Sequence, residues 1–102
     1  MKIPKLVAHR GHASQYPENT LPAIESALKA GACYVEVDIQ LTADHVPVLF
    51  HDDNMQRITG HSQNITQLKA NQLNQYSASE TTRFGDKFSN TTIPTLAELL
   101  TL

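Results

Sequence analysis

Residues Tyr34-Val35-Glu36-Val37-Asp38-Ile39 carry the clearest structural pattern in this chain. Apolar and acidic residues alternate at these positions as they do in a half-buried β-strand, where successive side chains point to opposite faces. The expected strand covers residues 34–41. One of its faces would carry Val35, Val37, Ile39 and Leu41, and the other Glu36, Asp38 and Gln40.

The pairing of Glu36 with Asp38 is the feature that points to chemistry. Two acids side by side on a half-buried face cost electrostatic energy unless a cation or a shared proton relieves their repulsion. Hard divalent cations with oxygen ligands are the usual relief. The alternative is an acidic strand face that is simply solvated.

Polar residues at the ends of neighbouring apolar runs favour a site. His9 and Arg10 follow the run at residues 6–8, and His51 follows the run at 46–50. α/β barrels and open α/β sheets place their chemistry at the carboxyl ends of strands. Two histidines form an acid–base set for displacement at phosphorus, and the guanidinium of Arg10 suits phosphate oxygens. The alternatives are a packed or capping histidine and a surface salt bridge.

Composition and charge exclude several classes of protein. The chain has 102 residues and a formal net charge of -2, so it shows no basic excess that would predict nucleic-acid binding. No apolar run is long enough to predict stable membrane insertion, and the first residues lack an apolar signal region, so a cytoplasmic location is expected. The single cysteine, Cys33, cannot form an internal disulfide and is expected to be a small core residue.

The first half of the chain predicts a βαβ unit. A strand at residues 5–8 is followed by a polar loop and a helix at 21–30, capped by Asn19 or Thr20, and then by the strand at 34–41. The two strands should be parallel. Within the helix the apolar stripe is expected to contain Leu21, Ile24 and Leu28, supported by Ala23 and Ala27.

The second half is less regular. Residues 42–46 are too few for a helical crossover to the next strand at 47–50, so either a hairpin or an extended crossover is expected. Residues 54–92 are rich in polar residues and predict a loop or insertion, with a short helix supported by Ile65, Leu68 and Leu73. A helical pattern then begins at Pro94.

Several short strings along the chain together resemble the glycerophosphodiester phosphodiesterase family, in its order and at its spacings. The resemblance implies an α/β fold, namely the N-terminal part of a TIM-type (β/α)8 barrel of the PLC-like phosphodiesterase type. The strings are His9-Arg10-Gly11, Pro17-Glu18-Asn19-Thr20, Glu36-Val37-Asp38, Leu41-Thr42-Ala43-Asp44, Val48 to Asp52, Arg57-Ile58-Thr59-Gly60 and Ile93-Pro94-Thr95-Leu96.

The resemblance also implies an incomplete domain. A TIM barrel takes ~250 residues, so residues 1–102 are expected to be a single partial domain, with 53–92 as its loop or insertion region. The family's third acidic metal ligand lies on a later strand and is not expected among these residues. His45 stands where the family generally has glycine, and a turn with positive φ is expected to tolerate it.

Family members hydrolyse glycerophosphodiesters to glycerol 3-phosphate and an alcohol with a divalent metal. By resemblance, His9 and His51 are the acid–base pair, in an order that spacing does not decide. Glu36 and Asp38 are two ligands of Mg or Ca. The phosphate contact is Arg10, and the matching residues Glu18 and Asn19 are assigned to substrate binding, chiefly by orienting their loop.

Two alternatives to this function stay open. The first is a non-catalytic half-barrel that binds phosphate or metal, and its unpaired sheet edges would favour a homo-oligomer. The second is a sphingomyelinase D-like phospholipase, which shares a similar layout of His, Glu and Asp. The string at residues 17–20 favours the glycerophosphodiesterase, with a small-molecule glycerophosphodiester as substrate.

Overall fold

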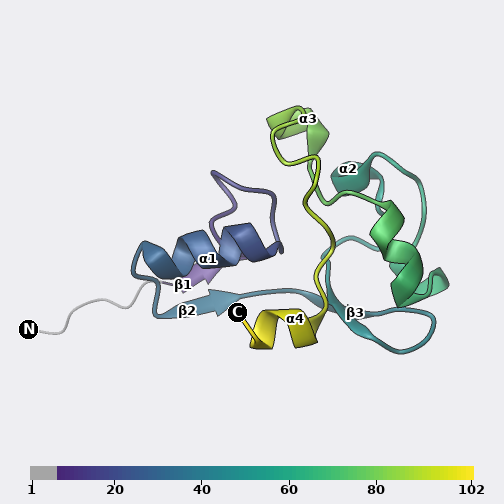
Figure 1. Cartoon of the computed structure of the whole chain (residues 1–102), viewed down its shortest axis with the longest axis horizontal. Helices are drawn as coiled ribbons and strands as arrows, with labels where there is room; N and C mark the ends of the chain where they lie inside the picture. The colour runs from purple at the N-terminus through teal and green to yellow at the C-terminus, as the bar shows by residue number, and fades with distance from the viewer. Residues whose placement is uncertain (1–6) are drawn as a thin grey trace, which may run out of the picture.

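A parallel βαβ unit forms the first part of the fold (Figure 1). In the computed structural model, which describes residues 7–102, β1 (Val7–His9) pairs in parallel with β2 (Tyr34–Glu36), and α1 (Leu21–Lys29) connects them. The register places His9 beside Glu36. The predicted βαβ unit is therefore confirmed, while residues 5 and 6 of the expected first strand lie outside the described residues.

Helix α1 begins where the sequence predicts. Thr20 is its N-cap, with Oγ1 accepting from the Ala23 N–H, and the buried face is formed by Ala23, Ile24 and Ala27. The expected burial of Leu28 is wrong, because this side chain is 50% exposed. At 3.6 residues per turn, Leu28 lies about 90° around the helix from the centre of the buried face.

The expected continuous strand at residues 34–41 is also wrong. It is divided into β2 and β3 (Ile39–Leu41), and β3 forms an antiparallel hairpin with β4 (Pro47–Leu49). At the division, the N–H of Asp38 donates to Oδ1 of Asn19 rather than to a neighbouring strand. Residues 42–46 therefore connect the two strands as a hairpin and not as an extended crossover. His45 lies in the turn with a φ of 63°.

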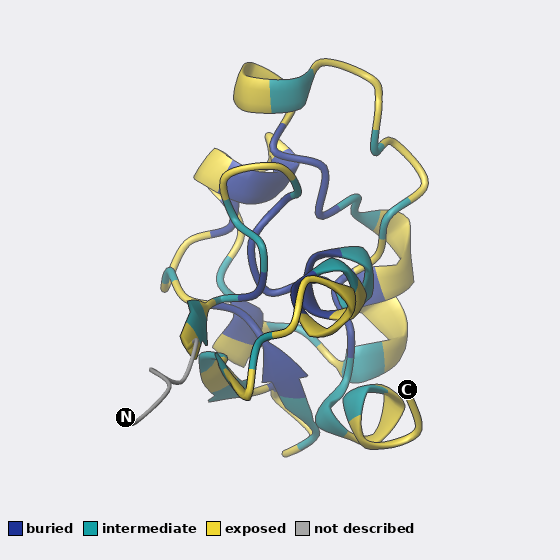
Figure 2. Ribbon diagram, turned by 90° about the vertical axis from the view of Figure 1, so that its left-hand side faces the viewer, coloured by how far each residue is buried: buried dark blue, intermediate teal, exposed yellow. Residues whose placement is uncertain are grey.

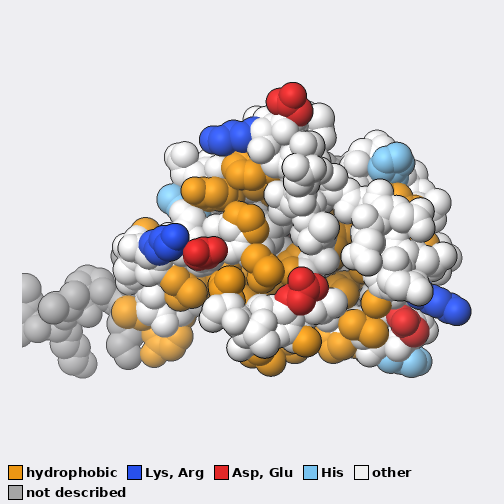
Figure 3. All heavy atoms as spheres, viewed as in Figure 1, with side chains coloured by type: hydrophobic (Ala, Val, Ile, Leu, Met, Phe, Trp, Pro, Cys, Tyr) orange, Lys and Arg blue, Asp and Glu red, His pale blue; other side chains and the backbone are white. Residues whose placement is uncertain are grey.

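The apolar face expected on this strand is poorly covered. Ile39 and Leu41 are 43% and 48% exposed, and Cys33 is exposed rather than a core residue. Figure 3 shows hydrophobic side chains in a band across one face of the molecule. Ile39 and Leu41 lie on β3, and within residues 7–102 β3 and β4 form a sheet of only two strands.

The main core is formed by residues of β4 and of the polar stretch that follows it. Figure 2 shows the buried residues in dark blue in the interior of the fold. The expected single helix around Ile65, Leu68 and Leu73 is wrong, because Ile65 and Leu73 lie in separate 3-10 helices. The stretch contains α2 (Gln56–Thr59), η1 (Ile65–Gln67), η2 (Ala70–Gln75) and α3 (Thr81–Phe84). Its core consists of Val48, Phe50, Met55, Ile58, Ile65, Leu73, Ala78 and Ile93.

The last helix, α4 (Leu96–Leu100), begins with a capping box. Oγ1 of Thr95 accepts from the Glu98 N–H, and the Glu98 carboxylate accepts from the Thr95 N–H. The segment before it joins the hairpin, since the Leu49 N–H donates to the Pro94 carbonyl at 2.9 Å. Every helix within residues 7–102 falls short of the length and apolarity needed to span a membrane.

Candidate active site

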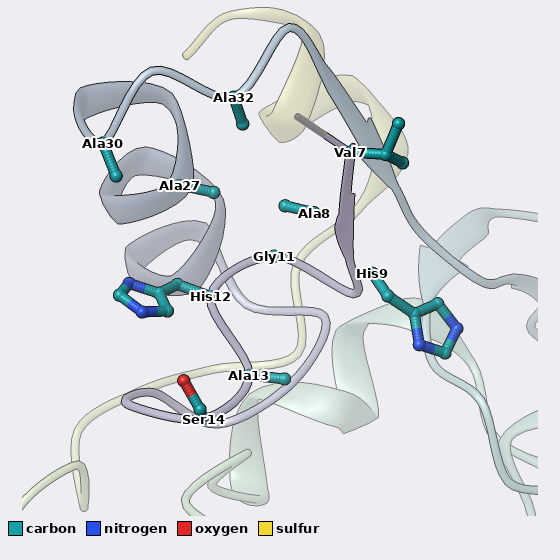
Figure 4. A pocket seen from close by; sticks show the side chains of 10 residues that line it. All are labelled: Val7, Ala8, His9, Gly11, His12, Ala13, Ser14, Ala27, Ala30 and Ala32. Atoms are coloured by element: carbon teal, nitrogen blue, oxygen red, sulfur yellow. The ribbon is translucent and has the colours of Figure 1, made fainter. Parts of the chain in front are cut away.

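His9 and Glu36 meet at the carboxyl ends of the two parallel strands. Nε2 of His9 lies 3.1 Å from Oε1 of Glu36, and their side chains are 61% and 59% exposed. Figure 4 shows the His9 ring pointing away from α1 and from His12. This pair is therefore accessible to a molecule in solvent.

Arg10 is held between two carboxylates. Its backbone has φ 59°, and its N–H donates to the Glu36 carbonyl at 2.6 Å. Nη1 donates to Oε2 of Glu18 at 3.1 Å. Nε lies 3.1 Å from Oδ2 of Asp38 without the alignment of a hydrogen bond, so that contact is an electrostatic one. The guanidinium is thus fixed at the strand ends by charge on two sides.

Asn19 positions Asp38. The Asn19 side chain is buried, its Nδ2 donates to Oδ2 of Asp38 at 3.1 Å, and its Oδ1 accepts from the Asp38 N–H at 3.1 Å. Its φ of 55° is a left-handed conformation that asparagine tolerates better than most residues. One side chain therefore fixes both the backbone and the carboxylate of Asp38.

Arg57 joins Glu18 to the loop after β4. Its Nη1 donates to Oε1 of the buried Glu18 at 2.8 Å, and its Nε and Nη2 donate to Asp52 at 2.9 and 3.0 Å. These hydrogen bonds lower the pKa of Asp52 to about 2. Bonds to Asp52, and then to Glu18, raise the pKa of Arg57 above its ordinary value. The pair is therefore fully charged at neutral pH.

His51 is anchored by its neighbours. Nδ1 of His51 lies 2.8 Å from Oδ1 of Asp52. Nε2 of Gln40 donates to the carbonyl oxygens of Phe50, His51 and Asp52 at 3.2, 3.0 and 2.7 Å. Because the contact with Asp52 occupies Nδ1, Nε2 is the ring nitrogen available for proton transfer.

All seven residues predicted for the site belong to one chain of contacts, which we call the site network. Contacts of Arg10, Glu18 and Asp38 form its centre, and Arg57 extends it to the second histidine. Its members are His9, Glu36, Arg10, Asp38, Asn19, Glu18, Arg57, Asp52 and His51. The geometry brings these side chains together, and their catalytic roles stay predictions.

The sequence did not predict the parts played by Arg57, Gln40 and Glu80. Arg57 stands in one of the strings that resemble the family, which is a signal of importance but not of contact. Gln40 follows Glu36 and Asp38 at the two-residue spacing of a strand, so the sequence placed it on the same face as the two acids but did not predict its contacts. Glu80 accepts from the Glu18 N–H across 62 residues of chain, and no local pattern marks it.

The donor chemistry of Glu36 and Asp38 suits Mg or Ca, because both ions prefer carboxylate oxygens. The Glu36 carboxylate is exposed to solvent. Oδ2 of Asp38 already contacts both Nε of Arg10 and Nδ2 of Asn19. Residues 7–102 contain no group of three or more His, Cys, Asp and Glu side chains that could hold a metal. Glu36 and Asp38 are therefore the carboxylates at this edge of the sheet whose chemistry fits such an ion, and their role as ligands stays a prediction.

An open groove of about 490 Å³ lies between β1 and α1 (Figure 4). Small side chains such as Ala8, Ala27 and Ala30 line most of it, and His9 is the one member of the site network among the lining residues. His12 lies on the α1 side of the groove, with Nδ1 2.9 Å from Oγ of Ser26. The groove is therefore a mainly apolar surface beside the site network.

The fold and the site network define an α/β protein with polar side chains collected at the carboxyl ends of its strands. A family model described as "Glycerophosphoryl diester phosphodiesterase family" matches residues 9–102. The chain belongs to this family. Its fold is the N-terminal part of a TIM-type barrel, as predicted.

Individual relatives agree with this assignment. The chain is 42% identical to glycerophosphodiester phosphodiesterase 1 of Rattus norvegicus, over 93% of this chain and 29% of the relative. Glycerophosphodiester phosphodiesterase of Caldanaerobacter subterraneus is 35% identical, over 95% of this chain and 39% of the relative. The chain therefore spans well under half the length of these relatives.

Two solved structures share the fold. Glycerophosphodiester phosphodiesterase from Agrobacterium tumefaciens superposes with a TM-score of 0.88 and 32% identity, over 96% of this chain and 42% of the other. A phosphodiesterase from Oleispira antarctica, solved in complex with the product sn-glycerol-3-phosphate, gives a TM-score of 0.85 and 38% identity, over 94% of this chain and 38% of the other.

Proposed function

We propose that this chain carries the first part of the active site for metal-dependent hydrolysis of glycerophosphodiesters to glycerol 3-phosphate and an alcohol. The observation that supports this most is the site network, which links His9 to His51 through Arg10, Glu18 and Arg57. The Oleispira antarctica relative holds sn-glycerol-3-phosphate, which supports the substrate class. Completion of the site is assigned to residues beyond those in this chain.

The two histidines would divide the proton transfers between them. Asp52 beside Nδ1 of His51 favours a proton on that nitrogen, so Nε2 is free to accept or donate one. Glu36 orients His9 in the same way from Nε2. One imidazole takes the proton of the attacking hydroxyl, and the other protonates the leaving alkoxide.

Arg10 would contact the phosphate. Glu18 and Asp38 fix its guanidinium before substrate arrives, so little conformational entropy is lost on binding. Glu36 and Asp38 would hold Mg or Ca, and the bound ion would neutralise charge that develops on the phosphate oxygens. Asn19 holds the carboxylate of Asp38 in place for this role.

The partner proposed for this site is a small glycerophosphodiester rather than a polymer. A formal net charge of -2 gives the chain no general attraction for nucleic acid. Four donors of Arg10 and Arg57 already pair with carboxylates, so the charge within the network is largely balanced.

The test is release of glycerol 3-phosphate from glycerophosphoethanolamine by a version of the chain extended to the length of its relatives. Release that requires Mg or Ca, stops with EDTA, and falls at least about 10²-fold in His9→Ala and His51→Ala would support the proposal. Glu25→Ala is the matched control, because Glu25 is 52% exposed and pairs with Lys29, outside the site network. Absence of release under all metal conditions would contradict the proposed activity.

A further inference from the structure

We infer that Glu80 is a positioning residue for the site: its buried carboxylate holds the backbone of Glu18 and, through Glu18, the guanidinium of Arg10. The inference rests on the proposed function for its consequence, and on contacts for its geometry. Glu80 lies in the polar stretch after β4, far along the chain from the motif at residues 17–20.

The geometry of Glu80 is unusual. Its side chain is almost fully buried, and its backbone has φ 44° and ψ 58°. Residues with a Cβ seldom adopt this left-handed conformation, and they keep it where the surroundings hold it. Here its N–H donates to the Ile58 carbonyl at 3.0 Å, while Oε1 accepts from the Glu18 N–H at 2.9 Å.

Arg83 completes the attachment. Its Nη1 donates to Oε2 of Glu80 at 2.9 Å, and its Nη2 donates to the carbonyl oxygen of Ala13. The loop before α1 is therefore hydrogen-bonded at two points, at Ala13 by Arg83 and at Glu18 by Glu80. The buried charge of Glu80 is paired, as burial of a carboxylate requires.

The attachment reaches the site through Glu18. The same residue whose N–H is held by Glu80 uses its carboxylate oxygens to accept from Arg10 and Arg57. If the Glu18 backbone moves, the carboxylate moves with it, and Arg10 loses one of its two charged partners. Glu80 would thus act on phosphate binding without contacting phosphate.

Two substitutions of Glu80 distinguish its hydrogen bond to the Glu18 N–H from its negative charge. Glu80→Gln keeps a side-chain oxygen that can accept from the Glu18 N–H, whereas Glu80→Ala removes it. Glu25→Ala is the matched control, because Glu25 is 52% exposed and pairs with Lys29 on α1. Circular dichroism and urea unfolding of each variant are measured first, to establish that the chain remains folded.

The experiment measures three quantities on the 102-residue chain by NMR: hydrogen exchange of the Glu18 amide, the chemical shift of the Arg10 Nε–H, and binding of sn-glycerol 3-phosphate. In Glu80→Ala we expect Glu18 exchange to rise about 10-fold, the Arg10 resonance to shift, and binding to weaken about 5-fold or more. In Glu80→Gln, the Glu18 exchange rate and the affinity for glycerol 3-phosphate should stay within about 3-fold of those of the natural chain. In Glu25→Ala, both should equal those of the natural chain.

The outcomes separate the two proposals. Unchanged Glu18 exchange in Glu80→Ala would overturn the inference, and so would faster exchange with an unmoved Arg10 resonance. Failure of the natural chain to bind glycerol 3-phosphate would count against the phosphate contact proposed for Arg10, whereas the proposed hydrolysis is tested on the extended chain. The exchange and the Arg10 resonance would still decide whether Glu80 positions the site.

Discussion

Nη1 of Arg57 lies 2.8 Å from Oε1 of Glu18 and joins α2 to the loop before α1, 39 residues earlier in the chain. Arg57 also holds Asp52, which contacts His51. A single guanidinium therefore links the loop that carries Arg10's partner to the loop that carries the second histidine. The two halves of the site depend on this side chain for their relative placement.

Removal of this guanidinium should destabilise the chain. Arg57→Ala leaves the buried Glu18 with Arg10 as its remaining cation, and a buried carboxylate that loses a partner is costly. Because Arg57 is 45% exposed, solvent screens its charge and reduces this cost. We therefore expect the free energy of unfolding to fall by about 1–2 kcal/mol. Urea unfolding at neutral pH measures it, with Lys29→Ala as the control for an exposed pair. Equal stability of the two variants would contradict the prediction.

The stability of the chain should depend on Asp52 at acidic pH. The hydrogen bonds of Arg57 hold the pKa of Asp52 at about 2 in the folded chain, below the ordinary 3.8. A lowered carboxyl pKa stabilises the folded state above the unfolded pKa, and this contribution is lost as the pH falls through the folded pKa.

Between about pH 5 and about pH 2, the free energy of unfolding of the natural chain should therefore fall more steeply than that of Asp52→Asn. Urea unfolding at stepped pH measures both curves. The difference between the curves isolates Asp52 from the other carboxyl groups, which titrate in both proteins. Parallel curves would show that the pairing with Arg57 does not favour the folded state.

Gly11 should tolerate no side chain. A Cβ at this position would lie 2.8 Å from the backbone carbon of Ala23, and φ is 82°. Overpacking against a helix backbone adds to the cost of positive φ, so Gly11→Ala should cost about 2–4 kcal/mol. Gly31→Ala is the matched control, because its φ is 95° but nothing lies within 4 Å of the added Cβ. Thermal unfolding should show the smaller loss at Gly31.

The two roles of Asn19 can be separated. Asn19→Gly permits the left-handed backbone but removes the hydrogen bonds to Asp38, and Asn19→Ala removes the bonds while it strains the backbone. We expect Asn19→Ala to be less stable than Asn19→Gly by about 1 kcal/mol. Both should weaken Mg or Ca binding, as measured by calorimetry, because the Asp38 carboxylate loses its support. Tight metal binding by both variants would rule out the role assigned to Asn19.

The small core after β4 should be essential to the folded chain. Ile65 is fully buried among Met55, Ile58 and Leu73, so Ile65→Ala should cost about 2–4 kcal/mol. Leu100→Ala is the control, since Leu100 is 76% exposed. Urea unfolding compares the two, and a small effect at Ile65 would mean that residues 54–92 pack only loosely on β4.

The local elements were predictable where the signal lies within a few residues. Thr20 and Pro22 fix the start of α1, and the alternation around Glu36 identifies β2. The prediction failed at Asp38, because its N–H pairs with the Asn19 side chain instead of a strand. That competition between a side chain and a sheet ladder depends on a loop 19 residues away, which periodicity does not describe.

Burial was predicted less well than periodicity. Ile39, Leu41 and Cys33 have the character of core residues but remain exposed or half-exposed, because the two-stranded sheets of residues 7–102 offer little to cover them. Conversely, Met55 and Ile65 are buried within a stretch whose composition predicted a loop. Burial depends on which other elements are present, and that is a property of the assembled fold.

The family, the βαβ unit and the residue types of the site could be predicted from the sequence, because motifs, caps and strand alternation are local. Two contacts of Glu18 follow from folding instead: its carboxylate accepts from both Arg10 and Arg57, and its backbone N–H donates to Glu80. Ion pairs of this kind form between side chains that folding brings within about 3 Å. Sequence spacing does not encode such distances, so the connections of the site had to come from the fold.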